Sequence, residues 1–232
     1  MRKLIALFTL TTGLLMTANT VWASPTAEFE KGAMSVEIGS TLDSKVSGRG
    51  KASADVVGEF GFKATATAGI NDRFAVQLKH GMFKSERTTI PVPIPMPPYT
   101  VSMTTYAKAE PSDLNVLYKV NPNLTFITGY EYTKISYGDF VSSASKSALH
   151  FGFTGTHKLN DDYTLFATLL GGKDVSLKEF GVSYKMSKST TFNVSYAERK
   201  VKNVDLKVPA AYINGKENYT MKGISCLFAF KL

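Results

Sequence analysis

The stretch from Lys222 to Leu232 alternates between large apolar residues and residues that are mostly small or polar. The apolar positions are Ile224, Cys226, Phe228, Phe230 and Leu232. A period of two is the period of a β-strand, so one face of this segment is apolar. A soluble domain ending on such a strand would expose a flat apolar edge that favours aggregation. The pattern therefore favours a strand whose apolar face contacts lipid and whose edges are paired.

Nine segments before this one show the same alternation, and no segment has a convincing helical period. They span residues 33–46, 53–68, 73–83, a stretch ending at 114–120, then 124–137, 147–158, 163–170, 175–186 and 190–201. The segment 163–170 alternates least cleanly, because Phe166 and Leu170 fall on its polar side. We therefore expect ten strands, with eight as the alternative count.

The connections between these segments alternate in length. Residues 70–73, 120–123, 159–162 and 186–189 are short and contain the turn-forming residues Asn, Asp, Pro or Ser. The connections at 48–52, 84–109, 138–146, 171–174 and 202–215 are mostly longer. Short turns at one end and longer loops at the other predict an all-β, up-and-down antiparallel barrel, with both termini on the short-turn side.

Alternation alone does not say which face points outward. The apolar face carries aromatic residues near the strand ends: Phe74, Tyr130, Tyr132, Tyr163, Tyr184, Tyr196 and Tyr219. Aromatic residues at this level are typical of the two interfaces of a membrane. The interior of a barrel of about ten strands is also too narrow for so many rings. We therefore predict a transmembrane barrel with an apolar exterior and a polar interior.

Residues 1–23 have the pattern of a secretory signal peptide. Arg2 and Lys3 precede an apolar core at 4–16, and Val21-Trp22-Ala23 is a small-x-small cleavage site. The barrel domain is then 24–232. The full chain has a net charge of +8. Secretion argues against a nucleic-acid partner, so the charge favours membrane lipid and lipopolysaccharide.

The terminal alternation, the signal peptide and the turn asymmetry together resemble the small bacterial outer-membrane β-barrels, of the OmpA/OmpX-like and opacity-like kinds. In that family the last strand is recognised by the outer-membrane insertion machinery. The resemblance implies this role for Ile224, Phe228, Phe230 and Leu232, although the family pattern usually ends in Phe or Trp. It also implies the outer membrane of a Gram-negative-type bacterium, with surface loops used for adhesion, contact with a host molecule or other ligand, or envelope integrity.

Charged residues recur on the face predicted to point inward: Glu37, Glu59, Lys63, Lys79, Lys119, Glu131, Glu179, Lys185 and Arg199. An unpaired buried charge is costly, so many long charged side chains in a narrow lumen favour a paired network that plugs the barrel. The alternative is a charged constriction in a narrow passive pore.

The loop segment 88–100 alternates proline with apolar residues. The alternation predicts polyproline-II geometry without strand pairing. Its apolar members are Ile90, Val92, Ile94, Met96 and Tyr99. One interpretation is that these residues bind a partner or a lipid surface. The alternatives are that the segment is a stiff spacer, or a loop folded over the mouth of the barrel.

No spacing of residues indicates a metal site, a cofactor site or a catalytic triad. His150 beside the serine-rich stretch 142–147 is a weak signal for catalysis. The leading hypothesis is a non-enzymatic surface barrel that presents binding loops. A narrow passive channel is the second hypothesis, and a barrel enzyme acting on lipid or peptide is the third.

Overall fold

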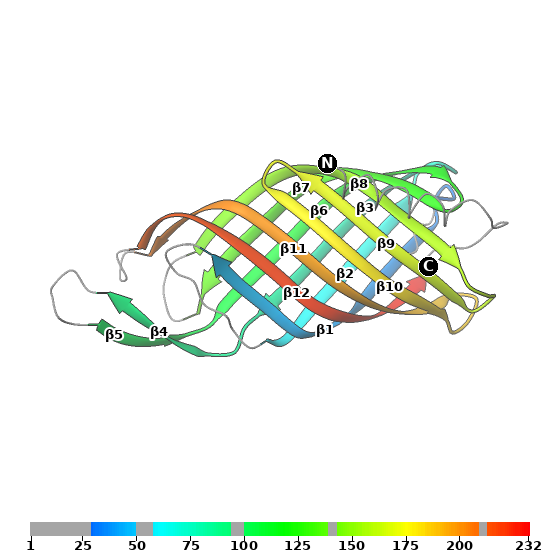
Figure 1. Ribbon diagram of the computed structural model, residues 1–232. Helices are drawn as coiled ribbons and strands as arrows, with labels where there is room; N and C mark the ends of the chain where they lie inside the picture. The colour runs from blue at the N-terminus through cyan, green and yellow to red at the C-terminus, as the bar shows by residue number, and fades with distance from the viewer. Residues whose placement is uncertain (1–28, 50–57, 94–99, 139–142, 209–212) are drawn as a thin grey trace, which may run out of the picture.

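Ten antiparallel strands form a closed barrel in the computed structural model, which describes residues 29–49, 58–93, 100–138, 143–208 and 213–232 (Figure 1). The barrel strands are β1 (Met34–Arg49), β2 (Glu59–Gly69), β3 (Phe74–Lys84), β6 (Ala107–Asn121), β7 (Leu124–Tyr137), β8 (Ser143–Lys158), β9 (Tyr163–Gly172), β10 (Val175–Lys185), β11 (Thr190–Val208) and β12 (Ile213–Lys231). The first and last strands pair from Ser35↔Lys231 to Arg49↔Asn218 and close the cylinder. No helix in the described ranges is long and apolar enough to cross a membrane. The predicted ten-stranded barrel is confirmed.

The short turns are held by the side chains that predicted them. Asn71 Oδ1 accepts hydrogen bonds from the backbone N–H groups of Arg73 and Phe74, both at 2.9 Å. Asn160 Oδ1 accepts from Asp162 and Tyr163 in the same way. Asn side chains that bond to the backbone two or three residues later fix a tight turn, so these residues set where each hairpin reverses.

The opposite, long-loop end of the barrel is called the outer end below. Here the strands run further than the alternation predicted. The β11–β12 ladder continues past a register shift to Val208↔Ile213, so most of the expected loop 202–215 is β-structure. Asn203 adopts a positive φ of 55° beside this shift. Asn tolerates that conformation better than most residues, which explains how the strand passes the irregularity and continues.

The proline-rich segment departs most clearly from its prediction. β4 (Thr88–Pro93) pairs with β5 (Thr100–Thr105) in a separate two-stranded sheet that projects from the outer end in Figure 1. The prediction that alternating prolines forbid pairing is wrong, because a proline removes only its own N–H and is tolerated where that group faces a free edge. Ile90 and Val92 lie in β4, whereas Ile94, Met96 and Tyr99 lie outside the described residues.

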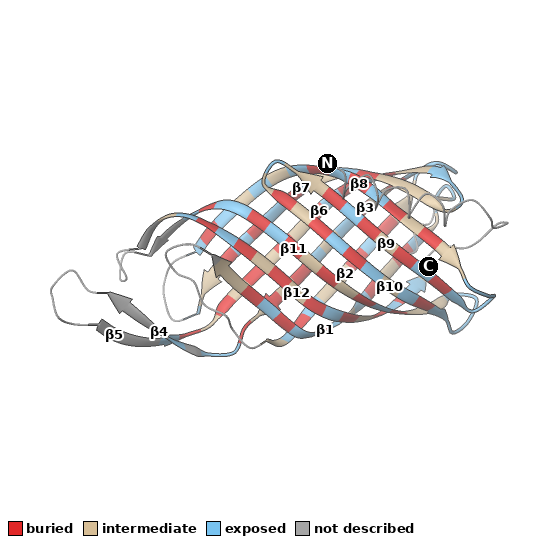
Figure 2. Ribbon diagram, in the orientation of Figure 1, coloured by how far each residue is buried: buried red, intermediate tan, exposed pale blue. Residues whose placement is uncertain are grey.

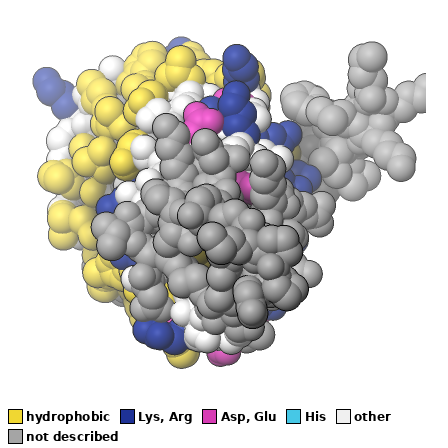
Figure 3. All heavy atoms as spheres, turned by 90° about the vertical axis from the view of Figure 1, so that its left-hand side faces the viewer, with side chains coloured by type: hydrophobic (Ala, Val, Ile, Leu, Met, Phe, Trp, Pro, Cys, Tyr) yellow, Lys and Arg dark blue, Asp and Glu magenta, His cyan; other side chains and the backbone are white. Residues whose placement is uncertain are grey.

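The exterior of the barrel is apolar, as predicted. Phe60 is 74% exposed and Phe180 is 59% exposed, and buried and exposed residues alternate along the strands in Figure 2. Rings on adjacent strands pack together on this surface, as in the Phe192–Phe228 pair with centroids 5.0 Å apart. Viewed from the outer end, apolar side chains cover much of the flank and Lys and Arg gather near the rim (Figure 3). Such an exterior is stable in hydrocarbon and unfavourable in water.

Tyr219 is the exception among the aromatic residues predicted to face lipid. It is 1% exposed and points into the barrel. Along β12 it has the same parity as Gly223 and Ser225, so alternation within its own strand turns it inward. Its neighbour in parity, Met221, is also fully buried.

Candidate functional site

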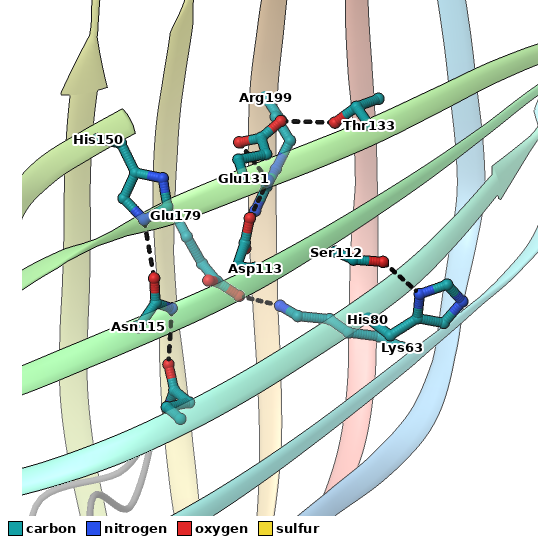
Figure 4. Close-up of polar contacts among 11 residues, drawn as sticks. Lys63, His80, Ser112, Asp113, Asn115, Glu131, Thr133, His150, Glu179 and Arg199 are labelled. Carbon is teal, nitrogen blue, oxygen red and sulfur yellow. Dashed lines mark hydrogen bonds and ion pairs between the residues drawn. The ribbon is translucent and has the colours of Figure 1, made fainter. Parts of the chain in front are cut away.

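Arg199 of β11 and two carboxylates from the opposite wall occupy the middle of the lumen. Arg199 Nη1 and Nη2 donate to the two oxygens of Asp113 on β6 at 2.8 and 2.6 Å. Nη1 also lies 2.6 Å from Glu131 Oε2 on β7, and all three side chains are buried (Figure 4). A bidentate guanidinium–carboxylate pair is strong and directional. The cluster therefore ties opposite walls of the barrel together through its interior.

A second ion pair crosses the lumen beside the first. Lys63 Nζ on β2 lies 2.5 Å from Glu179 Oε1 on β10, and Ser195 Oγ donates to the same oxygen at 2.9 Å. Lys79 lies within electrostatic range of Glu179 and Asp113. Glu37 accepts a hydrogen bond from Asn193 Nδ2 at 3.2 Å. Buried charges are tolerated when each has a partner of opposite sign or a hydrogen bond, and these meet that condition.

His150 belongs to a chain of uncharged polar residues next to the ion pairs. Its Nε2 lies 2.8 Å from Asn115 Oδ1, and Asn115 Nδ2 donates to Gln77 Oε1 at 3.3 Å. A Cβ on Gly129 would overlap Asn115 Oδ1 and come within 3.0 Å of His150 Nε2. Because Gly129 has no side chain, it leaves the space in which Asn115 and His150 contact each other.

Catalysis by His150 has little support from its surroundings. The side chain is 2% exposed, and the serines at 143, 145 and 147 lie on the exposed face of β8. Residues 139 and 142 lie outside the described part of the chain. A general base must reach its substrate, and this imidazole is enclosed by the lumen network.

Ligand atoms of Asp113, Glu131 and His150 lie within 4.8 Å of one another, which is the spacing of a metal site. Both carboxylates, however, already bind the guanidinium of Arg199. A divalent cation would have to enter beside this positive charge or displace it. The carboxylates are better explained as partners of Arg199 than as metal ligands.

The outer part of the lumen is filled by apolar side chains. The buried members of this outer cluster are Val46, Phe83, Ala107, Ala109, Ile135, Ala144, Val175, Val201, Val204, Tyr219 and Met221. The hydroxyl groups of Tyr137 and Tyr219 bond across it at 3.0 Å. A second cluster contains Ala75 and Leu117 and is packed by Phe29. Charged and apolar layers thus follow each other along the lumen.

Three residues of the predicted lumen network lie at its margins. Glu59 pairs with Lys84 at 2.6 Å and remains 39% exposed, Lys119 Nζ lies 5.7 Å from the ring centre of Phe29, and Lys185 is exposed at the end of β10. All three have inward parity, but they stand at or near strand ends, where a long side chain reaches the rim or solvent. Glu37, Lys63, Lys79, Glu131, Glu179 and Arg199 do come together inside.

The sequence-based set omits Asp113, although it is the main partner of Arg199. Asp113 shares the polar face of β6 with Asn115, so parity alone would have included it. Glu217 on β12 is likewise buried on the inward face. The two-residue alternation identifies which side chains point into the lumen. Which of these side chains form ion pairs depends on the register of the strands and on the closure of the barrel.

A polar clasp closes the wall above the short β9–β10 hairpin. Lys146 Nζ of β8 lies 2.8 Å from Asp174 Oδ2, and Asn203 Nδ2 of β11 donates to Asp174 Oδ1 at 2.8 Å. These hydrogen bonds, with that from Lys146 first, hold the pKa of the Asp174 carboxyl below its ordinary value. Beyond the hairpin no described strand lies between β8 and β11, so the clasp joins the two walls.

A row of charged residues crosses the outer surface just above the apolar band. Lys178, Glu198, Lys222 and Lys45 are register partners on β10, β11, β12 and β1. Glu198 binds Lys200 at 2.9 Å and Lys222 at 3.0 Å. The apolar residues Phe180, Tyr196 and Ile224 lie two positions below it on the same face.

Comparisons with known proteins identify the fold. No protein-family model and no curated protein sequence matches the chain. Outer membrane protease OmpT from Escherichia coli superposes with a TM-score of 0.54 at 13% identity, over 90% of this chain and 100% of that one. Neisserial surface protein A gives 0.41 at 10% identity over 87% and 100%, and Ail of Yersinia pestis gives 0.37 at 14% over 85% and 99%. Of these three superpositions, the first alone has a TM-score above 0.5. The chain has the fold of the small outer-membrane β-barrels of Gram-negative bacteria.

Proposed function

We propose that this chain is a non-enzymatic outer-membrane barrel whose outer loops, above all the β4–β5 hairpin, bind a partner at the cell surface. The observation that carries the proposal is the contrast between a filled lumen and a projecting hairpin that takes no part in the barrel. We call Thr88–Pro93 and Thr100–Thr105 together the arm. Binding sites on rigid scaffolds usually lie on such projecting segments.

The filled lumen supports a structural role for the barrel over transport. Its ion pairs connect opposite walls, and its apolar layers exclude water on either side of them. A water-filled pore would need polar, hydrated walls along its whole length. The described lumen instead holds buried ion pairs and clusters of buried apolar side chains.

The binding role is tested by replacing the arm. The full-length barrel in lipid nanodiscs is compared with a variant in which residues 88–105 are replaced by a short Gly-Ser turn. Binding is measured against a panel of immobilised extracellular-matrix proteins and surface glycans. We expect the arm replacement to abolish binding that the wild type shows, while heat-modifiable gel migration stays normal. Binding that is unchanged by the replacement would refute the role of the arm.

A narrow passive channel is the second candidate, favoured only by the presence of charges in the lumen. Conductance in planar bilayers separates the two. The filled lumen predicts no reproducible openings. Steady, uniform openings of the wild-type barrel would establish the channel.

An enzymatic role is the third candidate, because the superposed OmpT is named a protease. At 13% sequence identity, the similarity between the two proteins supports a common fold and not a common activity. The candidate requires a lipid- or peptide-hydrolysing activity that disappears in a His150→Ala variant. We expect no such activity, since the imidazole is enclosed.

We infer that anionic lipid headgroups, including lipopolysaccharide phosphates, bind Lys178 and Lys222 of the charged row together with Lys200, which pairs with Glu198 of the same row. Phosphates lie directly above the hydrocarbon, which is where this row stands relative to Phe180 and Ile224. Lysine side chains near an anionic surface each contribute about 1 kcal/mol of attraction. The variant Lys200→Gln with Lys222→Gln is expected to retain less lipopolysaccharide after purification, and equal retention would contradict the inference.

Residues 1–23 are proposed to direct secretion. The β12 residues Ile224, Phe228 and Phe230, with Leu232 directly after the strand, are proposed to contact the insertion machinery. The exposure of all four on the outer face supports the second role. A Phe230→Ser variant should accumulate outside the membrane fraction, whereas Thr190→Ser on the neighbouring strand should not. Equal insertion of both variants would contradict this role.

A further inference from the structure

The arm is a hairpin whose two edges differ chemically. Its register pairs Ile90 with Met103 and Val92 with Val101, alternating with Pro91↔Ser102 and Pro93↔Thr100. In an antiparallel ladder, residues direct their N–H and C=O groups alternately to the partner strand and to the opposite edge. Proline has no N–H, so Pro91 and Pro93 occupy the positions that face away from β5.

The free edge of β4 is therefore closed to strand addition. Two successive edge positions, Pro91 and Pro93, offer no donor, and proline on an edge is a known barrier to pairing. An incoming strand could still donate to the carbonyls of Pro91 and Pro93, but it would find no N–H donor at either position.

The free edge of β5 is open. By the same alternation, Thr100, Ser102 and Thr104 direct their N–H and C=O groups away from β4. No described strand other than β4 pairs with β5, since the arm forms a sheet separate from the barrel. A row of donors and acceptors repeating every second residue matches the backbone of another extended chain.

The two faces of the arm also differ. Cross-strand partners share a face, and the hydroxyls of Thr89 and Thr104 bond to each other at 3.0 Å on one of them. The positions of Pro91 and Ser102 belong to this face. By the register, the positions of Ile90, Val92, Val101 and Met103 belong to the opposite face, and all four are apolar residue types. A strand added at β5 with an apolar residue at every second position would match this alternation.

The base of the arm is fixed to the barrel. The backbone N–H of Ser85 donates to the Ala107 carbonyl at 2.9 Å, and Ser85 Oγ accepts from the Ala107 N–H at 2.8 Å. Lys84 Nζ lies 4.9 Å from the ring centre of Tyr106. These contacts hold the two ends of the arm next to each other at the rim of the barrel.

We propose that β5 accepts one extended peptide segment of a partner protein, apolar at every second residue, by β-strand addition. The prolines of β4 confine strand addition to the β5 side of the hairpin, because the β4 edge lacks two successive N–H donors. The proposal rests on the proposed function of the arm and names the chemistry of its partner.

The direct test is a Ser102→Pro variant of the full-length barrel in nanodiscs. It removes a donor from the open edge at the position opposite Pro91, where the ladder does not use that N–H. The probe is a fluorescent peptide of sequence Thr-Val-Thr-Val-Thr-Val-Thr, followed by anisotropy. We expect Ser102→Pro to weaken binding at least tenfold and N-methylation of alternate peptide residues to abolish it. Equal binding of the methylated peptide would overturn the proposal.

A Met103→Pro variant is the matched control for folding of the arm. It removes an N–H that the ladder with β4 uses, so it should disrupt the hairpin and its hydrogen-exchange protection, whereas Ser102→Pro should preserve that protection. Loss of protection in Ser102→Pro would show that the assigned edge is wrong. Wild-type binding by Ser102→Pro with the hairpin intact would also overturn strand addition.

The reverse experiment opens the closed edge. Pro91→Ser with Pro93→Thr gives both edges a full set of donors. We expect this variant to associate at concentrations where the wild type is monomeric, as followed by light scattering. Wild-type self-association abolished by Ser102→Pro would identify a second copy, and not a partner protein, as the occupant.

These experiments separate the two proposals. Partner binding that is lost on arm replacement but kept in Ser102→Pro would leave the proposed function intact and refute strand addition. Binding that survives arm replacement would refute both.

Discussion

Replacing Arg199 with methionine tests whether the lumen is a desolvated ionic core or a hydrated passage. The change keeps a long side chain but removes the cation that binds Asp113 and Glu131. The Arg199 side chain is 9% exposed and the two carboxylates are 2% and 3% exposed, so water replaces few of the lost bonds.

The expected cost follows from these contacts. Breaking a buried ion pair by removing one partner typically destabilises a protein by about 3–5 kcal/mol, because the other charge remains buried. Two carboxylates lose their common partner here, so we expect the upper half of that range. Lys200→Met is the matched control on the next residue of β11. Its side chain is 45% exposed, and a surface pair of this kind is worth about 0–1 kcal/mol.

The assay is urea unfolding in lipid vesicles, with the folded fraction read from unheated gel migration. Adding Asp113→Asn and Glu131→Gln to Arg199→Met should recover much of the loss, because the uncompensated charges disappear. A cost below about 1 kcal/mol for Arg199→Met, equal to that of Lys200→Met, would show that water screens the cluster. The packed-lumen interpretation would then be refuted.

Three further predictions concern individual positions. Gly129→Ala should cost about 1–3 kcal/mol in the same unfolding assay, because the added methyl overlaps its cross-strand neighbours, whereas Gly171→Ala should be nearly neutral, since nothing lies within 4 Å of its added Cβ. Tyr219→Ala should cost about 3–5 kcal/mol and Tyr219→Phe about 1 kcal/mol, and equal costs would contradict a packed outer cluster. The pKa of Asp174 is lowered mainly by its hydrogen bond with Lys146, so the stabilisation from the clasp is present above the ordinary carboxyl pKa of 3.8 and is lost as the pH falls through the lowered value. Hydrogen exchange at the β9–β10 turn should follow this titration in the wild type and not in Asp174→Asn.

The sequence was sufficient to predict the ten barrel strands and the face that most of their residues occupy, because both depend on local alternation and turn chemistry. Asn71 and Asn160 marked the hairpin reversals correctly. Even the irregular strand was informative: Phe166 and Leu170, which broke the pattern of 163–170, do point into the lumen and are 5% and 8% exposed. From the sequence alone these residues are only an irregularity, and their burial shows that part of the lumen is apolar.

The pairing within the lumen could not be predicted in the same way. Arg199 meets Asp113 across 86 positions of sequence, and their contact depends on the stagger of ten strands around the closed barrel. Lys119 and Lys185 occupy inward-facing positions in the alternation but lie at strand ends. Their position along the barrel axis therefore determines whether they contact the lumen network or solvent.

The arm shows a different limit. Alternating proline was interpreted as a property of the whole segment, yet its effect is confined to the N–H of each proline. The strand partner that made pairing possible, Thr100–Thr105, lies beyond the proline-rich stretch and had no marked pattern of its own. The conformational preference of proline alone therefore did not predict a hairpin that forms between two segments.

The central claim is that apolar side chains face lipid and charged ones face the interior, and a tryptophan placed on either face tests it directly. The sequence contains one tryptophan, Trp22, which is replaced by Phe in the background. In vesicles containing brominated lipid, we expect strong fluorescence quenching of the Phe180→Trp variant, whose parent residue is 59% exposed, and little quenching of Phe166→Trp, whose parent residue is 5% exposed. Quenching of the Phe166→Trp variant with protection of Phe180→Trp would reverse the two faces and contradict the account.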